Sequence, residues 1–456
     1  MSADHYDAFS VESVYAELLG RAPENKMEPR MEPMFRAMDF LGEPNKAAPV
    51  IHITGTNGKT STARILESLL LAHDLRVGRY TSPHLSKVTE RISLDGEPVD
   101  DETFVRIWDE IRPYLSMVDA ELEERGENRL TYFEAVTILA FAVFADEPVD
   151  VVVLEVGLGG ITDATNVADG QVSVVTPISL DHTDLLGDRV EDIAAEKAGI
   201  VKAGGFLVSA AQEPDAAQVL LDAAREKGVE FRFEGVEFGV EQREMGVGGQ
   251  QLTVRSLAGR YEELLLPLHG AHQAQNAAVA IAALEAFIGG GEKELDVETL
   301  RAGLEKVTSP GRLEVVRTSP TIVVDAAHNP DGVRASAEAI KEVFGFTKLV
   351  LVVGILAEKD AEAMLVELRE AYGDLVEDIC LTQSTSPRAI PAGELGRLAL
   401  NAGFADEDLH AAEKLDDALE WAVGRADATE DFGGGGVLVT GSITLVAEAR
   451  TLLGKS

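Results

Sequence analysis

The stretch PVIHITGTNGKTSTARILESLLLA, residues 49–72, joins an apolar run to a helical pattern through a loop that contains two glycines. Its first six residues predict a strand, and the apolar spacing over 59–72 predicts a helix with one buried face. Glycines let such a loop turn its backbone N–H groups toward phosphate, while Lys59 supplies a cation and Thr60 a hydroxyl for Mg²⁺. The loop departs from the common GxxxxGK[ST] pattern because Ile53 stands where that pattern has its first glycine. It predicts a nucleotide site, and on its own it leaves kinases, GTPases, transport ATPases and ligases open.

The alternation of apolar runs and helical patterns continues along the whole chain. Residues 149–156 and 172–178 are almost uninterrupted apolar runs, which are typical of parallel strands covered on both faces. The last third repeats the pattern, so the sequence predicts an α/β protein with crossover helices. A turn-rich segment at 308–312 predicts a boundary between domains at 1–305 and 306–456, the first with a mostly parallel sheet and the second smaller and Rossmann-like.

Composition excludes several classes of function. The chain has 79 acidic and 40 basic residues among 456, a formal net charge of −39, which opposes binding to nucleic-acid phosphates and to anionic lipid. With 45% hydrophobic residues the chain can form a hydrophobic core. The large negative charge favours a protein adapted to a high-salt cytoplasm, where salt screens the repulsion between its acidic residues. The single Cys380 cannot form an internal disulfide, and the longest apolar stretch, 135–145, is too short to cross a bilayer. We expect a cytoplasmic protein that binds neither nucleic acid nor membrane.

Polar side chains follow the ends of several predicted strands, where open α/β sheets place their sites. Ser82, Glu155 and His182 occur in the segments TSPHL, LEVGLGG and LDHTD. Each alone has an ordinary structural explanation, such as a turn, a cap or a satisfied histidine. Together with the phosphate loop they can form a Mg²⁺ site, in which the imidazole is the least expected ligand. Lys197, in EKAGI, has by its spacing the pattern of a solvent-facing helical lysine.

Taken together, these segments resemble the Mur ligase superfamily, and within it the folylpolyglutamate synthase/dihydrofolate synthase family. The resemblance extends from about residue 31 to the last predicted helix. Ten segments occur in the order typical of the family: IHITGTNGKTS (51–61), TSPHL with a following Glu-Arg pair (81–91), LTYFEAVT (130–137), LEVGLGG with DATN (154–166), LDHTDLLG (180–187), EKAGI (196–200), GAHQAQNAAVA (270–280), PGR (310–312), DAAHNP (325–330) and TGSITLV (440–446).

The resemblance implies ATP-dependent ligation of glutamate, through its α-amino group, to a folate carboxylate. Because an oxide is a poor leaving group, the carboxylate first takes the γ-phosphoryl group of ATP, and the amine then expels phosphate from the acyl phosphate. Cations must cancel the repulsion between the two anions. The implied partners are ATP, L-glutamate, folate or dihydropteroate, and Mg²⁺, and a monomer is expected.

Several alternatives stay open beside folylpolyglutamate synthesis. The chain could also, or only, add glutamate to dihydropteroate as a dihydrofolate synthase, or it could bind folate or nucleotide without turnover. A cell-wall Mur ligase is the nearest other enzyme. About fifty residues precede the loop, too few for the nucleotide-sugar domain that such enzymes carry there.

The resemblance also assigns roles to individual residues. The ATP contacts lie in the loop and in three later segments: Gly55, Thr56, Asn57, Gly58, Lys59, Thr60, Ser61, Asn276, Arg312 and Asp325. The metal ligands are Thr60, Ser82, Glu155 and His182. The pterin contacts are Thr131, Tyr132, Phe133, Thr162, Asp163 and Ala164, and the glutamate contacts are His328 and Ser442. Catalytic roles fall to Lys59, His182, Lys197 and Asp325, with Lys197 carbamylated. Ile161 replaces an arginine common in the family, so substrate contacts there are expected to differ.

Overall fold

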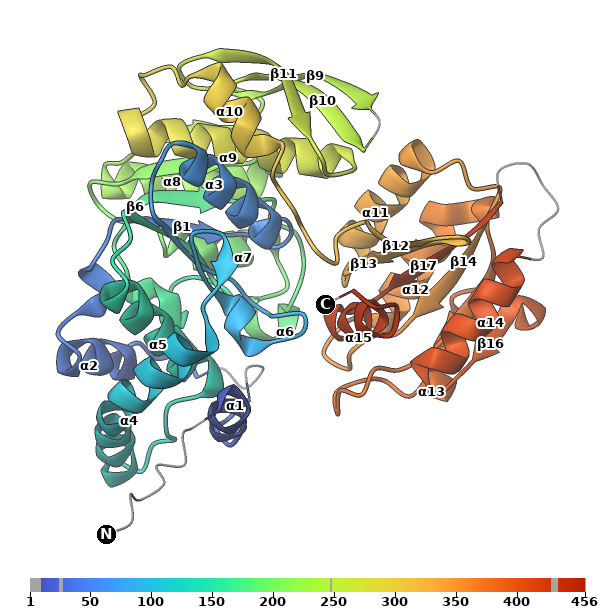
Figure 1. Cartoon of the computed structure of the whole chain (residues 1–456), viewed down its shortest axis with the longest axis horizontal. Coiled ribbons are helices and arrows are strands. Elements are labelled where there is room, and N and C mark those ends of the chain that lie inside the picture. The colour runs from blue at the N-terminus through green and yellow to red at the C-terminus, as the bar shows by residue number, and fades with distance from the viewer. Residues whose placement is uncertain (1–9, 24–27, 247, 428–433, 456) are drawn as a thin grey trace, which may run out of the picture.

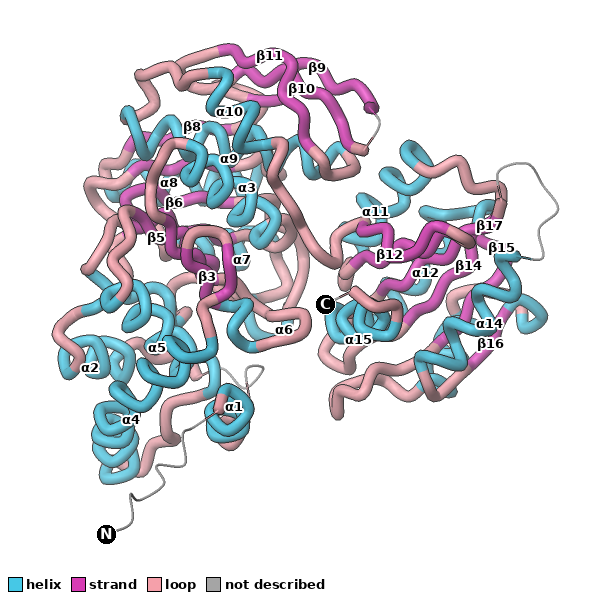
Figure 2. Tube along the Cα trace, viewed as in Figure 1, coloured by secondary structure: helices cyan, strands magenta, loops and turns pink. Residues whose placement is uncertain are grey.

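The computed structural model describes residues 10–23, 28–246, 248–427 and 434–455, and it contains three β-sheets (Figures 1 and 2). The first sheet has eight strands in the order β4-β3-β2-β5-β1-β6-β7-β8. All neighbours from β2 to β8 are parallel, and β3 and β4 add an antiparallel edge. The strands are β1 (Val50–Thr54), β2 (Val77–Tyr80), β3 (Ile92–Leu94), β4 (Glu97–Pro98), β5 (Val151–Glu155), β6 (Gly170–Val175), β7 (Phe206–Ser209) and β8 (Glu230–Phe233).

Helices cover both faces of this sheet, which explains why its strands are apolar on both sides. Ile51 and Ile53 of β1 pack in one core with the helices α3 and α9, whereas Val152 and Leu154 of β5 face α4 and α5 in another. The helices of this part are α1 (Val11–Leu19), α2 (Glu32–Phe40), α3 (Lys59–Ala72), α4 (Asp101–Glu124), α5 (Tyr132–Asp146), α6 (Thr183–Leu186), α7 (Val190–Ala198), α8 (Pro214–Lys227), α9 (Ala271–Gly289) and α10 (Val297–Leu304).

The strand predicted at 172–178 ends earlier, at Val175, than its apolar run suggests. Pro177 has no N–H to donate to a ladder, so the chain leaves the sheet before it. Its carbonyl instead accepts from the backbone N–H groups of Thr56 at 2.9 Å and Asn57 at 3.4 Å. The end of β6 therefore holds the loop that follows β1.

A small antiparallel sheet, in the order β11-β10-β9, precedes α9 in the chain. Its strands are β9 (Gly239–Gly246), β10 (Gly249–Arg255) and β11 (Arg260–Leu266). Arg243 of β9 forms a two-pronged ion pair with Glu342 at 2.6 and 2.8 Å. This pair joins the small sheet to the C-terminal part of the molecule.

The third sheet forms the C-terminal part, which stands beside the first (Figure 1). Its order is β12-β13-β17-β14-β15-β16, parallel except for the β12–β13 pair. Three helices, α11 to α13, pack in the core on one face, and α14 and α15 in the core on the other. The strands are β12 (Glu314–Thr318), β13 (Thr321–Asp325), β14 (Lys348–Val353), β15 (Val376–Leu381), β16 (Leu409–Ala411) and β17 (Gly435–Thr440). The helices are α11 (Pro330–Val343), α12 (Ala361–Tyr372), α13 (Ala392–Asn401), α14 (Leu415–Asp427) and α15 (Ile443–Leu452).

The predicted fold class is confirmed: a mostly parallel sheet with the phosphate loop is followed by a smaller, doubly wound α/β unit. Within the described ranges, no helix is both long enough and apolar enough to cross a membrane.

Candidate active site

The loop between β1 and α3 is shaped by close contacts that only glycine allows. Gly55 and Gly58 have φ of +145° and +88°. A Cβ on Gly55 would lie 1.8 Å from the hydroxyl of Thr176, and one on Gly58 would lie 2.6 Å from Oδ1 of Asn276. The Lys59 ammonium donates back to the Gly55 carbonyl at 3.0 Å. The loop is thus a tight cradle with the Lys59 ammonium folded over it, and Asn276, a predicted ATP contact, lies directly against it.

Glu155, at the end of β5, faces this cradle. Its carboxylate is 1% exposed and accepts from the Thr60 hydroxyl at 2.8 and 3.1 Å. Burial raises the pKa of Glu155, although Lys59, Thr60 and the Ser82 backbone N–H all favour its ionised form. A buried carboxylate with a threonine hydroxyl on it and Ser82 beside it is a set of hard oxygen donors, which suits Mg²⁺.

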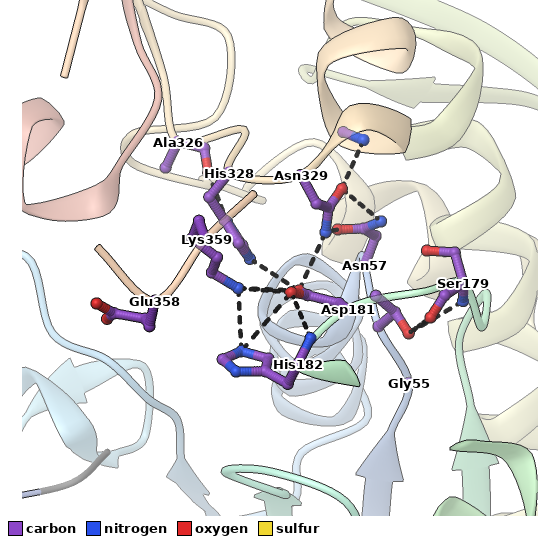
Figure 3. A network of polar contacts seen from close by, with 12 residues as sticks. Gly55, Asn57, Ser179, Asp181, His182, Ala326, His328, Asn329, Glu358 and Lys359 are labelled. Atoms are coloured by element: carbon purple, nitrogen blue, oxygen red, sulfur yellow. Dashed lines mark hydrogen bonds and ion pairs between the residues drawn. The ribbon is translucent and has the colours of Figure 1, made fainter. Parts of the chain in front are cut away.

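Asp181 lies at the centre of a polar network that joins the two parts of the molecule (Figure 3). The Lys359 ammonium donates to its two carboxylate oxygens at 2.8 and 3.0 Å, and Asn329 donates to it at 3.2 Å. Asn329 also exchanges hydrogen bonds with Asn57 of the loop at 3.0 and 3.2 Å. Burial on its own would raise the pKa of Asp181, but Lys359, His182 and His328 outweigh it and hold the pKa well below its usual range.

His182 takes part in this network through its Nε2 atom, which accepts from Lys359 at 3.0 Å. Burial, with Lys359 adding to it, lowers the pKa of His182 to about 4, so its ring is neutral at pH 7. Among the residues that the structure describes, no group of three or more His, Cys, Asp and Glu side chains could hold a metal. The oxygen donors around Glu155 are therefore the best-fitting metal set, and a metal role for His182 stays a prediction.

Lys197 is buried, and its interpretation as a solvent-facing lysine is wrong. Its side chain is on α7, is 3% exposed, and donates to the Gly55 carbonyl at 2.8 Å. Burial, with a contribution from Lys59, lowers the pKa of Lys197 to about 7. The α7 helix packs so that the lysine face lies under the phosphate loop, which helical spacing alone cannot show.

The C-terminal part contributes Arg312 and Asp325. Asp325, at the end of β13, is 7% exposed and accepts from the Leu313 N–H at 3.1 Å. Burial raises the pKa of Asp325, and Arg312 opposes that effect. Burial also lowers the pKa of His328 to about 3. Ser442 is the N-cap of α15, accepting from the Leu445 N–H at 3.3 Å.

A cavity of about 410 Å³ brings most of the predicted site residues together. Among those that line it are the whole loop 55–61 and Ser82, Phe133, Glu155, Asp163, His182, Lys197, Asn276, Arg312, Asp325, His328 and Ser442. Four predicted pterin contacts do not line it: Thr131, Tyr132, Thr162 and Ala164. Thr131 caps α5 through a bond from the Glu134 N–H, and the ring of Tyr132 is 4% exposed beneath the Arg91 guanidinium.

Lys359, Arg388 and His272 also line the cavity but were not predicted as site residues. Lys359 follows β14 in the charged triplet Glu-Lys-Asp, and this position after a strand is the signal that could have identified it. His272 is in the first turn of α9, one helical turn before Asn276.

Comparison with known proteins identifies the class. Residues 53–284 match the Mur ligase middle domain, and residues 311–443 match the Mur ligase glutamate ligase domain. The chain is therefore a ligase of the Mur type.

Whole-chain similarity identifies the family. The dihydrofolate synthase/folylpolyglutamate synthase of Mycobacterium tuberculosis is 41% identical over 455 residues, which cover 95% of this chain and 92% of that protein. The structure of Mycobacterium tuberculosis folylpolyglutamate synthase complexed with ADP superposes with a TM-score of 0.92 at 40% identity and covers 98% of both chains. The structure of Escherichia coli FolC in complex with DHPP and ADP superposes with a TM-score of 0.82 at 31% identity and also covers 98% of both chains. The chain belongs to the dihydrofolate synthase/folylpolyglutamate synthase family.

Proposed function

We propose that this protein joins L-glutamate to a folate carboxylate at the expense of ATP, through an acyl-phosphate intermediate. The observation that supports this most directly is the single cavity in which the phosphate loop and Glu155 face Arg312, Asp325 and His328. A cavity lined by all of these groups lets the reacting ends of a nucleotide, a carboxylate acceptor and an amino acid meet at one point. Dihydrofolate synthesis, alone or in addition, is the alternative that the cavity leaves open.

The chemistry needs positive charge where the phosphoryl group moves and where glutamate arrives. Lys59 in the loop and Arg312 opposite it would bind the phosphates of ATP. Thr60, Ser82 and Glu155 would hold Mg²⁺, which when bound neutralises the charge on the transferred phosphoryl group. Lys359, which is paired with Asp181, and Arg388, which is paired with Glu358, line the same cavity as His328 and Ser442 and would meet the glutamate carboxylates. Cations from both parts of the molecule would thus surround the reacting carboxyl group.

A product assay tests the proposal. The protein is incubated with ATP, Mg²⁺ and glutamate, once with tetrahydrofolate and once with dihydropteroate as the acceptor. The masses of the products are then measured by mass spectrometry. We expect one added glutamate or more on tetrahydrofolate, and phosphate release only when folate and glutamate are both present. Transfer to neither acceptor would refute the proposal, and transfer to dihydropteroate alone would select the alternative.

We also propose that Lys197 is carbamylated. Because burial lowers the pKa of Lys197 to about 7, much of its amine is neutral at pH 7, which is the form that carbamylation requires: the nitrogen adds to CO₂, loses a proton and becomes a carbamate anion. The Lys197→Ala variant should lose about 10²-fold or more of ligase activity, and short carboxylates should restore part of it. Lys202→Ala is the control, since Lys202 is half-buried, does not line the cavity, and donates to the Asn166 carbonyl at 3.2 Å. Undiminished activity in Lys197→Ala would contradict the idea.

We propose a cytoplasmic monomer with its domains at 1–305 and 306–456, where the second begins after α10.

The net charge of −39 predicts that activity depends on salt. ATP, folate and glutamate are all anions, so the long-range field of the protein repels them, and molar salt screens that repulsion while close contacts survive. We expect ligase activity to rise with KCl up to molar concentration in steady-state assays. A steady loss of activity over this range would contradict adaptation to high salt.

A further inference from the structure

His52 is a buried histidine in the middle of β1, three residues before Gly55, where the phosphate loop begins. Its side chain is 0% exposed, and β1 runs between β5 and β6. Its Nε2 atom lies 2.8 Å from the hydroxyl oxygen of Thr165. Its Nδ1 atom is buried and has no hydrogen-bond partner among the described residues. None of the steps described above uses this histidine.

Thr165 continues the contact to a second buried group, Asp163. The Thr165 hydroxyl lies 2.5 Å from Oδ1 of Asp163, which also accepts from the Thr165 backbone N–H at 3.0 Å. The other oxygen, Oδ2, accepts from the Leu158 N–H at 2.9 Å. His52, Thr165 and Asp163 therefore form an unbroken chain of hydrogen bonds, which we call the His52 relay.

The direction of donation along the relay follows from the unpartnered Nδ1. A buried N–H without an acceptor is rarer in proteins than a buried acceptor without a donor, so Nδ1 is the bare nitrogen and Nε2 carries the proton. Burial, with Lys202 adding to it, lowers the pKa of His52 to about 3, so the ring stays neutral. Nε2–H then donates to Thr165, whose own hydroxyl proton is left to donate to Asp163. The hydrogen bond from Thr165 favours the carboxylate form of Asp163 and opposes burial, which raises the pKa of that group.

Asp163 in turn holds one wall of the cavity. The turn that it binds, 157–159, lines the cavity next to Phe133. The Phe133 ring lies so close to this turn that a Cβ on Gly157 would be 2.4 Å from its Cζ atom. The Thr54 hydroxyl, from the end of β1, donates to the Gly159 carbonyl at 2.9 Å and fixes the same turn from the other side. The position of the Phe133 ring thus depends on a turn held by Asp163.

We propose that His52 and Thr165 are positioning residues for the acceptor end of the active site. Acting through Asp163, they hold the 157–159 turn and the Phe133 ring, against which the aromatic part of the acceptor lies. This inference rests on the proposed function, because it assigns the Phe133 side of the cavity to the acceptor. It predicts that the relay affects acceptor binding and leaves nucleotide binding alone.

The test compares Thr165→Val, which removes the hydroxyl at constant shape, with Thr165→Ser, which keeps it. We expect Thr165→Val to raise KM for the acceptor about 10-fold, the effect of leaving one buried hydrogen-bonding group unsatisfied, with KM for ATP within about 2-fold of wild type. Thr165→Ser should stay close to wild type in both. An unchanged acceptor KM in Thr165→Val, or an equal rise in both KM values, would overturn the proposal.

A second measurement covers the case in which Thr165→Val fails to fold. The tautomer of His52 is read by ¹⁵N NMR of histidine-labelled protein, with the signal assigned by its loss in His52→Gln. Protonated Nε2 with bare Nδ1 is the expected result, and a proton on Nδ1 would overturn the relay. This readout needs no substrate. If the wild-type chain were to ligate glutamate to neither acceptor, the proposed function would fail while the tautomer would still decide the direction of the relay.

Discussion

Replacing Lys59 with methionine should lower ligase activity by about 10²- to 10³-fold, the loss typical when one preorganised donor to a developing negative charge is removed. Lys59 is the cation of the phosphate loop, and its ammonium is held over the cradle by the Gly55 and Thr56 carbonyls at 3.0 and 3.1 Å. Burial lowers the pKa of Lys59, while Glu155 and Asp181 oppose that effect. Methionine keeps the length of the side chain but has no charge and no donor, so phosphate repulsion is no longer cancelled.

The measurement is steady-state phosphate release with folate and glutamate present, together with calorimetric titration of ATP. Lys202→Met is the matched control, because that lysine is half-buried but does not line the cavity. The control should keep activity within about 2-fold of wild type, whereas Lys59→Met should lose both turnover and most ATP affinity. Retention of a tenth or more of wild-type activity by Lys59→Met would show that the Lys59 charge is not what neutralises the transferred phosphate.

The parts of the site that could be predicted are local in sequence. The strand, loop and helix over 49–72 are specified by apolar spacing and glycines within one short segment, and the structure has them there. Glu155 was expected at a strand end for the same reason, and it lies there, 2.8 Å from the Thr60 hydroxyl. Local rules suffice here because each residue is positioned by its own strand.

The parts that could not be predicted depend on packing between distant segments. Lys359 comes to Asp181 across 178 positions of sequence, and Asn329 to Asn57 across 272. Lys197 has the spacing of a surface lysine, yet it lies under the phosphate loop because α7 packs there. Tyr132 was expected at the substrate, and the structure places its ring beneath Arg91 instead. Periodicity tells which residues share a face, and tertiary packing alone tells what that face meets.

Replacing Asp181 with asparagine should remove about 3–5 kcal/mol from the free energy that holds the two parts of the molecule together. Asp181 and Lys359 are 11% and 10% exposed, so the substitution leaves an ammonium buried without its counter-charge, and this penalty is characteristic of a broken buried pair. The pKa of Asp181 in the folded protein lies below its unfolded value of about 4. The ionised carboxylate therefore contributes its full stabilisation above about pH 4, and this stabilisation is lost as the pH falls from there through the folded pKa. Ligase activity should fall as well, since Lys359 lines the cavity.

Two comparisons make this expectation specific to the buried pair. The double variant Asp181→Asn/Lys359→Met removes both charges, so it should recover much of the stability in denaturant titrations while ligase activity stays low. The matched control is another link between the two parts, the Arg243–Glu342 pair, whose side chains are 22% and 34% exposed. Because a solvent-exposed ion pair contributes about 0–1 kcal/mol, Glu342→Gln should change stability by no more than that. If Asp181→Asn proved as mild as Glu342→Gln, the Asp181 network would not be what fixes the C-terminal part against the phosphate loop.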